Sequence, residues 1–434
     1  MTEPTLARAL NTKQAESCIA RLYGAGPHVA ERQKTRMQSV IQLCYDITHS
    51  DDQHMFSVPG RIEICGNHTD HNHGKVLAAA VSCDAVCCVT PVPDNTITLF
   101  SRGFAEPFVV NLDNLGPVPE EKGTTTALLR GICARFTELG LNTGGFTGVL
   151  QSDVLVGSGL SSSAVVEMVI AKTLSVLFNN DALDAVSLAK IGQYAENRYF
   201  GKPCGLMDQT ACAEGGIISI DFEDFDNPEV RRINADFERF GYQVLVVHTG
   251  ANHVDLTDDY AAIPEEMAGV AEMFGKKVLR QITLDMVLSK ADKIRSELGD
   301  RAFIRAVHFF RENQRVDKQV SALNAEDVET FLSLVAESGD SSFKYLQNVF
   351  SPSTAREQGI AVALCMTDDF IGEKGEGACR VHGGGFAGTI QVFLRQQHVA
   401  AYTEYMEMLL GKGAVQCLGV RDQGAMYLNP MLKE

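Results

Sequence analysis

The sequence predicts a folded protein of mixed helices and strands, with room for two domains. Its 434 residues are about three times the length of a typical domain. Hydrophobic residues make up 45% of the chain and charged residues 21%, with 38 glycines, which is typical of a loop-rich α/β or α+β protein. Strand-like segments dominate the first half and helix-like segments the second. We therefore expect a mixed sheet early in the chain and a more helical part after it.

The first half is expected to begin with helices over residues 1–55 and to continue into a sheet. "MFSVPGRIEIC", "KVLAAAVSCDAVCCVTPV", "FTGVLQSDVL" and "GGIISIDF" are apolar and β-branched enough for strands. "SSSAVVEMVIAKTLSVLF" is apolar on nearly all faces, which predicts a buried helix, and "LDAVSLAKIGQYAENRYFG" predicts an amphipathic one. The polar stretch that follows suggests a boundary near residue 225, hence domains 1–225 and 226–434.

The second half opens with a predicted strand, "YQVLVVHTG", and continues mainly as helices from about residue 255 to 348. It closes with "GACRVHGGGFAGTIQVFL", which predicts two short strands around a glycine cluster. The chain contains no internal repeat, low-complexity tract or coiled-coil heptads.

Composition excludes several classes of function. The formal net charge of -17 argues against a protein that binds nucleic acid, because such binding depends on Lys and Arg neutralising phosphates. The 12 cysteines are scattered through apolar stretches of a long chain, so we expect reduced thiols. No signal pattern and no run of about 18 apolar residues occur. We expect a cytoplasmic protein without a membrane partner.

A glycine- and serine-rich segment, "DVLVGSGLSSSAVVEM", runs from a predicted strand into the buried helix. Such a segment suits an anion, because glycines allow close approach and a helix N-terminus offers free N–H groups. A linker or simple helix-capping serines are the alternatives, but a linker would not lead directly into so apolar a helix. Neither the Walker pattern nor the third glycine of the dinucleotide fingerprint is present. The candidate phosphate-binding residues are Gly157, Ser158, Gly159, Leu160, Ser161, Ser162 and Ser163.

A second segment, "PGRIEICGNHTDHNHGKVL", concentrates His68, His71 and His73 around Asp70. These residue types suggest a metal site. A zinc site, however, usually takes three or four ligands with room between them, and the chain has no matching His or Cys cluster downstream. Metal binding is therefore kept only as a third hypothesis.

Three motifs carry a resemblance to a known family. "PGRIEICGNHTDHNHG", "GSGLSSSA" and "RVHGGGFAG" occur in the order and at the spacing of the three signatures of the GHMP small-molecule kinases. The first resembles the galactokinase signature, and "AENRYFGKPCGLMDQTACAEGG" resembles the segment that carries that family's acidic catalytic residue. The resemblance covers most of the chain. It implies a two-lobed α+β fold, with an N-terminal mixed-sheet lobe, a C-terminal ferredoxin-like lobe, and ATP and sugar meeting between them.

The resemblance also implies catalytic roles. Asp208 matches the proposed base for the anomeric hydroxyl of the sugar, and Arg61 matches the arginine beside the base and the transferring phosphoryl group. Without the resemblance, Asp208 would be read as a solvated or helix-capping residue and Arg61 as half of a surface salt bridge.

Ser163 and Glu196 match the magnesium ligands that accompany ATP, and both supply the hard oxygen donors that Mg²⁺ prefers. An exposed helix position is the alternative for Glu196, and periodicity alone does not distinguish it from Glu167. The residues that match sugar contacts are Asn67, His68, Thr69, Asp70, Gly205 and Tyr260. For Tyr260 a core aromatic is the alternative, and for "HGGGFAG" a tight turn.

The chain departs from the family pattern at several positions. Asn67 replaces a glutamate that faces the C6 end of the sugar in the family, so a uronic acid becomes conceivable. Glu63 stands where an asparagine is usual and His382 where a small hydroxyl residue is usual. An extension of roughly twenty residues precedes the usual start. The catalytic and metal-ligand positions are retained, so the chemistry should be kept while the sugar is open.

The leading hypothesis is a monomeric, Mg²⁺-dependent sugar 1-kinase whose partners are ATP and a small sugar, most simply D-galactose. A kinase for galacturonate or another related sugar is the alternative within enzymes. A catalytically silent sugar sensor of the same family is the alternative from another class, although its altered serine loop is not found here.

Overall fold

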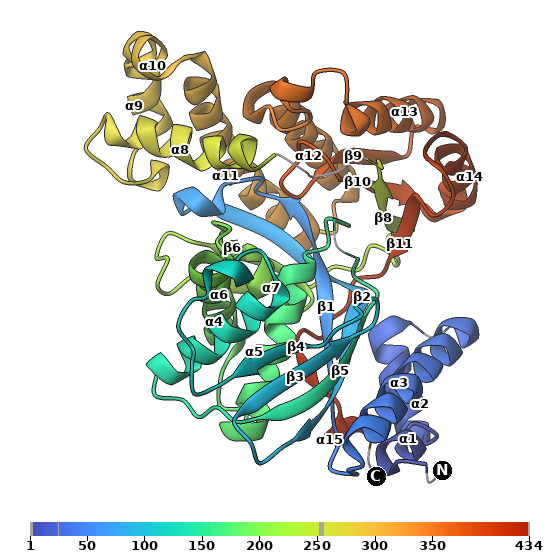
Figure 1. Cartoon of the computed structure of the whole chain (residues 1–434). Coiled ribbons are helices and arrows are strands. Elements are labelled where there is room, and N and C mark those ends of the chain that lie inside the picture. Colours follow the sequence, from blue (N-terminus) through green and yellow to red (C-terminus); the bar gives the residue numbers. More distant parts are fainter. Residues whose placement is uncertain (1–2, 25, 156, 251–255, 433–434) are drawn as a thin grey trace.

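The computed structural model describes residues 3–24, 26–155, 157–250 and 256–432, and contains two sheets with separate sets of helices (Figure 1). The larger sheet has eight strands in the described residues, in the order β12-β1-β2-β5-β3-β4, with β6 paired to β2 and β7 to β6. These strands are β1 (His54–Cys65), β2 (Lys75–Pro91), β3 (Thr96–Ser101), β4 (Phe108–Asn111), β5 (Phe146–Ser152), β6 (Ile217–Asp221), β7 (Glu229–Ile233) and β12 (Met426–Tyr427).

The larger sheet is mixed, as predicted. β3 pairs with β5 in parallel, whereas the other pairs of this sheet are antiparallel. β1 and β2 are buried along almost their whole length because helices cover both faces, and this explains their nearly continuous apolar sequence. The buried helix predicted after the serines is α5 (Ser162–Phe178).

The two faces of the larger sheet are covered by helices that come from different parts of the chain. One core joins the sheet to helices of its own lobe and extends into the C-terminal half, and the other joins it to helices from both ends of the chain. The first group, besides α5, is α4 (Thr125–Glu138), α6 (Ala185–Ala195) and α7 (Met207–Glu214); the second is α1 (Thr5–Ala9), α2 (Lys13–Tyr23), α3 (Pro27–Thr48) and α15 (Asn429–Leu432).

The N-terminal extension is anchored through a buried carboxylate. The Tyr23 hydroxyl of α2 donates to Asp84 Oδ2 at 2.7 Å, Arg36 of α3 pairs with Asp84 Oδ1, and Arg421 Nη1 lies 3.0 Å from Oδ2. The helices predicted over residues 1–55 are therefore confirmed, and the C-terminal helix packs beside them (Figure 1).

The smaller sheet is antiparallel, in the order β11-β8-β10-β9. Helices separate its first strand from its second and its third from its fourth, which is the ferredoxin-like β-α-β-β-α-β arrangement expected for the C-terminal lobe. Its strands are β8 (Tyr242–His248), β9 (Gly377–His382), β10 (Thr389–Arg395) and β11 (Val415–Leu418). The helices of this half are α8 (Thr257–Glu272), α9 (Leu284–Ser289), α10 (Ala291–Leu298), α11 (Asp300–Asn324), α12 (Val328–Ser341), α13 (Gly359–Lys374) and α14 (Val399–Leu410).

The predicted division into 1–225 and 226–434 stays a prediction. β7 lies beyond residue 225 but pairs with β6 of the larger sheet, and the chain returns to that sheet at β12. The larger-sheet lobe thus contains the end of the chain, a crossing that local patterns do not reveal. Among the described residues, no helix is long and apolar enough to cross a membrane.

Candidate active site

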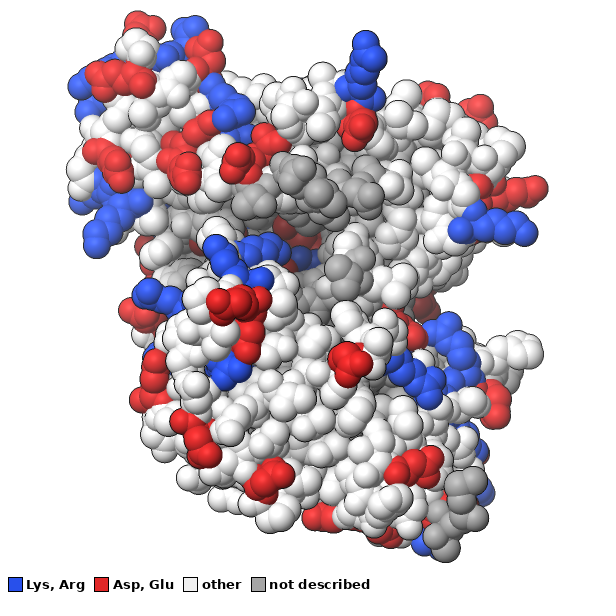
Figure 2. Space-filling model, viewed as in Figure 1, with Lys and Arg blue, Asp and Glu red and all other residues white. Residues whose placement is uncertain are grey.

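A hollow separates the two lobes on the face shown in Figure 2. Lys and Arg side chains gather at one edge of it, with Asp and Glu side chains directly beside them. The predicted site segments meet at the interface of the lobes, coming from β1, α5, α7 and the β9–β10 connection.

Arg61 and Asp208 form a bidentate ion pair. Arg61 Nε donates to Asp208 Oδ1 at 2.9 Å and Nη2 donates to Oδ2 at 2.7 Å, although 147 positions separate the two residues. Burial alone would raise the pKa of Asp208, but the Arg61 charge and the Ser161 hydroxyl outweigh burial and lower it. The Asp208 side chain is 30% exposed. An ionised carboxylate in this place can accept a proton or a hydrogen bond from a ligand.

The serine loop is fastened to this pair. Arg61 Nη1 donates to the Gly159 carbonyl, the Arg61 backbone N–H donates to Leu160 O at 3.1 Å, and the Ser161 hydroxyl donates to Asp208 Oδ2 at 2.7 Å. Gly157 and Gly159 have φ angles of 78° and 74°, the left-handed region that favours glycine. The first turn of α5 follows directly and supplies the free N–H groups of a helix N-terminus.

The third motif supports the loop from the other lobe. A Cβ added to Gly159 would lie 2.4 Å from Thr389 Oγ1 and 2.9 Å from His382 Nδ1, so a larger residue would clash. His382 Nδ1 lies 3.1 Å from Thr389 Oγ1, and its Nε2 accepts the Glu63 backbone N–H at 3.3 Å. His382, an unusual residue for the family, thus bridges the two lobes behind the loop.

Ser163 and Glu196 lie together, as a shared ligand would require. The Ser163 hydroxyl donates to Glu196 Oε1 at 3.0 Å. Glu196 begins a π-helical turn, a feature frequent at functional sites. Gln209 Nε2 donates to Glu196 Oε2 at 2.9 Å and to Glu167 Oε2 at 3.0 Å. A hydroxyl and a carboxylate beside a phosphate loop fit Mg²⁺, which takes its other ligands from phosphates and water.

Asp70 and Gly205 are in direct contact. A Cβ added to Gly205 would lie 1.6 Å from Asp70 Oδ2, so only glycine fits between this carboxylate and α7. Asp70 Oδ1 accepts the His71 backbone N–H at 3.0 Å, and within the described residues Oδ2 has no hydrogen-bond partner. Asp70 Oδ2 is therefore left to accept a hydrogen bond from a ligand.

Other predicted sugar contacts turn into the protein. Asn67 is 0% exposed, and its amide is bonded on both sides by protein groups. The Thr69 hydroxyl lies 2.9 Å from Gly66 O and 2.6 Å from Lys75 O, both of which can accept its proton. Both side chains are buried and shape the loop; the amide of Asn67 is fully bonded, and the proton of the Thr69 hydroxyl is committed to the backbone.

His68 and Tyr260 both contact the triple glycine. His68 Nε2 lies 2.9 Å from Gly384 O, and the Tyr260 hydroxyl donates to Gly385 O at 2.8 Å. Burial lowers the pKa of His68 to about 3, so the ring is neutral, donates to Gly384 through Nε2 and keeps Nδ1 as an acceptor. A Cβ on Gly384 would lie 2.3 Å from the Tyr260 ring, which explains the glycine there better than a tight turn does.

The three histidines of the first motif do not converge on one point. His68 is committed to Gly384, and the His73 ring stacks on Phe225 with ring centroids 5.0 Å apart. Within the described ranges, no group of three or more His, Cys, Asp and Glu side chains is arranged to hold a metal ion. The zinc hypothesis therefore has no geometric support.

One face of α11, which sequence patterns assigned only to the helical half, holds the sugar loop (residues 66–75). Glu312 Oε1 accepts the Gly66 N–H at 3.2 Å, and Asn313 Oδ1 accepts the Lys75 N–H at 2.8 Å. His308 Nε2 donates to the Asn67 carbonyl, 3.0 Å away. The sequence offers one signal for this role. In "HFFREN" the polar residues His308, Glu312 and Asn313 stand at positions i, i+4 and i+5, on the buried face of an amphipathic helix, where they require polar partners.

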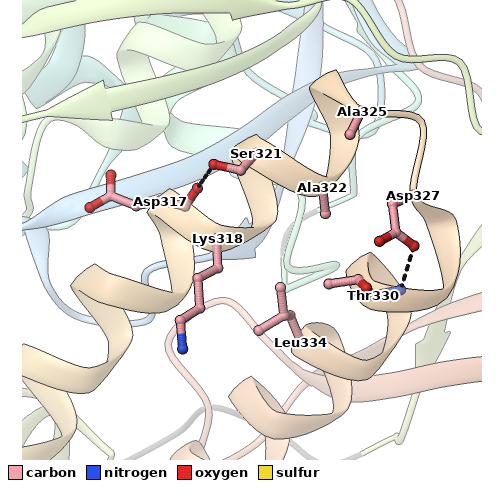
Figure 3. A pocket seen from close by; sticks show the side chains of 8 residues that line it. All are labelled: Asp317, Lys318, Ser321, Ala322, Ala325, Asp327, Thr330 and Leu334. Carbon is pink, nitrogen blue, oxygen red and sulfur yellow. Dashed lines mark hydrogen bonds between the residues drawn. The ribbon is translucent and has the colours of Figure 1, made fainter.

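Two hollows in the described residues differ in their relation to the candidate site. One, of about 400 Å³, borders the phosphate loop at Gly157 and Ser158 and reaches Asp153, His248 and Gln416. The other, of about 590 Å³, lies between the end of α11 and α12. Figure 3 shows it lined by Lys318, Ala322, Leu334 and their neighbours, none of which is a predicted site residue. The second hollow is therefore separate from the candidate site.

Comparisons with known proteins identify the family of this chain. Residues 46–91 match the galactokinase galactose-binding signature, and residues 127–216 match the GHMP kinases N terminal domain. A galactokinase of Glaesserella parasuis is 30% identical over 363 residues, which cover 81% of this chain and 88% of that protein. A galactokinase of Streptomyces coelicolor is 29% identical over 364 residues, 82% of this chain and 89% of that protein.

Solved structures show the same fold. The Lactococcus lactis galactokinase in complex with galactose superposes with a TM-score of 0.78 over 90% of this chain and 99% of that chain, at 19% identity. A mevalonate kinase superposes with a TM-score of 0.57 over 84% of this chain and 98% of that chain, at 17% identity. The expected GHMP kinase fold is thereby confirmed.

Proposed function

The chain belongs to the galactokinase family of the GHMP kinases, and we propose that it transfers the γ-phosphoryl group of ATP to the anomeric hydroxyl of D-galactose. The supporting observation is the bidentate Arg61–Asp208 pair, which is tied to the phosphate loop through the Gly159 carbonyl. This pair brings a proton acceptor and a permanent cation to one point. Phosphoryl transfer requires little more of a protein than position and charge.

Asp208 is proposed to accept the proton of the anomeric hydroxyl. Its two oxygens offer about four acceptor positions. Two are taken by Arg61 and one by Ser161, which leaves one for the sugar. As the O1–Pγ bond forms and the bond from Pγ to the bridging oxygen of ADP breaks, the proton moves to Asp208 and then to solvent. The products are galactose 1-phosphate, ADP and a proton.

Arg61 and the loop are proposed to hold the phosphates. The guanidinium stays charged at any working pH and can address phosphate oxygens while it remains paired with Asp208. The left-handed glycines and the N-terminus of α5 supply backbone N–H groups for the nucleotide. Ser163 and Glu196 are proposed to hold Mg²⁺, which neutralises charge on the phosphates when bound.

A sugar panel tests this proposal directly. Purified protein incubated with Mg²⁺ and ATP should release ADP with D-galactose and form a sugar 1-phosphate visible by phosphorus NMR. Omitting Mg²⁺ should abolish turnover. Absence of ADP release with galactose, galacturonate and related hexoses would overturn the proposal, and sugar binding without turnover would favour a sensor instead. The monomeric state and the cytoplasmic location expected from the sequence stay predictions.

A further inference from the structure

Strand β1 presents a second charged residue beside Arg61. Side chains alternate along a strand, so Arg61 and Glu63 share one face while Ile62 enters the core of the larger sheet. Glu63 is only 3% exposed. Its charge and that of Asp70 are close enough to affect each other, and the same holds for Arg61. Glu63 therefore lies next to both the catalytic pair and the sugar loop.

One oxygen of Glu63 is committed and the other is not. Oε1 accepts Asn67 Nδ2 at 2.9 Å and Arg380 Nη2 at 2.9 Å. Oε2 has no hydrogen-bond partner within the described residues. Burial raises the pKa of Glu63, but Arg380 is completely buried and a buried cation requires a counter-charge, so the Arg380 charge opposes this rise and favours the ionised carboxylate. Oε2 is not among the fully buried polar atoms that lack a partner, so a ligand or solvent can reach it.

Asn67 has no such capacity left. A side-chain amide can donate two hydrogen bonds and accept two. Nδ2 donates to Glu63 and to Gly383 O at 2.7 Å, and Oδ1 accepts from Ser342 Oγ at 3.2 Å and Asn348 Nδ2 at 2.8 Å. All four positions are filled by the protein, and they fix the plane of the amide against Glu63.

We propose that Glu63, through its free oxygen, is the sugar-contacting residue that determines specificity in this part of the site, and that Asn67 is a positioning residue that orients Glu63. This inference rests on the proposed sugar kinase function. The ligand it selects is a neutral, hydroxyl-bearing hexose, because an ionised oxygen accepts a hydroxyl proton readily and repels another carboxylate.

The charges around the site argue in the same direction. Glu63, Asp70 and Asp208 are three acidic groups near the sugar loop, and the neighbouring cations Arg61 and Arg380 are already paired with two of them. A sugar carboxylate would meet uncompensated negative charge at short range, where the local dielectric is low. The replacement at Asn67 therefore does not remove the negative charge from this part of the site, and galactose is preferred to galacturonate.

The test uses Glu63→Gln, which keeps an oxygen for Asn67 and Arg380 but removes the charge. We expect the KM for galactose to rise about 10- to 100-fold, the loss of one hydrogen bond to a charged group, with an unchanged KM for ATP. The preference for galactose over galacturonate should narrow by about tenfold or more. Glu214→Gln, the same change at the Arg232 ion pair, is the matched control and should leave both constants unchanged.

A series of deoxygalactoses identifies the contact itself. Removal of the hydroxyl that Glu63 binds should raise the KM for the sugar in the wild type but not in Glu63→Gln. A folded Glu63→Gln enzyme with wild-type KM for galactose would overturn the inference. So would a wild type that phosphorylates galacturonate as efficiently as galactose, a result that needs no variant to fold. Failure of the proposed function is distinct, because the wild type would then turn over no hexose.

Discussion

The catalytic centre (Arg61, Ser161 and Asp208) and the sugar loop (residues 66–75) are built in opposite ways. In the catalytic centre, polar side chains from three segments of one lobe bond to one another and stay partly open. In the sugar loop, the Asn67 and Thr69 side chains bond inward, and the loop is held from outside by α11. The side chains proposed to carry the chemistry thus come from one lobe, whereas the shape of the sugar site depends on contact between two.

The largest expected effect lies in the catalytic centre. Asp208→Asn keeps an oxygen for Arg61 but removes the proton acceptor, so kcat should fall by about 10²- to 10⁴-fold. Binding of galactose and ATP, measured by calorimetry, should change little. An unchanged kcat would show that Asp208 is not the base and that the chemistry is not carried by the catalytic centre.

Glu312→Gln addresses the support of the sugar loop. Burial alone would raise the pKa of Glu312, but His308, Arg315 and the Ser338 hydroxyl help to lower it to about 2. A depressed carboxyl pKa contributes stability above its unfolded value of 4.5, and the contribution is lost as pH falls toward 2. The variant should be less stable at neutral pH by about 3 kcal/mol.

Urea unfolding of both proteins between pH 7 and pH 2 measures this difference. The gap between wild type and Glu312→Gln should close progressively below about pH 4.5. A gap of constant size would mean that the carboxylate of Glu312 does not titrate in this way.

Gly205→Ala tests the contact between the sugar loop and α7. The new methyl group would overlap Asp70, and relieving such overlap costs about 1–3 kcal/mol, or about 5- to 150-fold in KM for the sugar. The KM for ATP should stay constant. Gly372→Ala in α13 is the control, because a Cβ there meets no atom within 4 Å, and it should not weaken sugar binding. An equal effect on both substrates would contradict the assignment of Asp70 to the sugar.

The smallest expected effect comes from Ser161→Gly. Glycine suits the φ of 63° at this position, so the variant removes the hydroxyl bond to Asp208 without straining the loop. Since that bond helps to lower the pKa of Asp208, the acid limb of the kcat/KM profile should move to higher pH. A shift to lower pH, or none, would show that Ser161 does not support the base.

Local patterns predicted much of the fold. The apolar runs of β1 and β2, the buried helix α5 and the strands around the glycine cluster all lie where periodicity placed them. The return of the chain to the larger sheet at β12 was not predicted, because a strand of two residues is too short to show the alternation of apolar and polar residues by which strands are predicted. The resemblance brought together Arg61 with Asp208 and Ser163 with Glu196, and the structure places each pair in contact, while their roles stay predictions.

The role of α11 in holding the sugar loop could not be predicted in the same way. Periodicity showed that His308 and Glu312 lie on a buried face, but buried polar groups take their partners from whatever the fold brings near. One partner of Glu312 is Gly66, 246 positions earlier. No local window contains both groups.

The sequence by itself determined that the loop is suited to bind an anion, because the left-handed glycines and the helix that follows are local features. It also determined that β1 carries Arg61 and Glu63 on one face, since alternation is intrinsic to a strand. Only the tertiary structure decided that Asn67 is saturated while Glu63 keeps a free oxygen. That outcome depends on Gly383, Ser342 and Asn348 filling the amide's hydrogen-bonding capacity, and these groups reach Asn67 only after the lobes have packed.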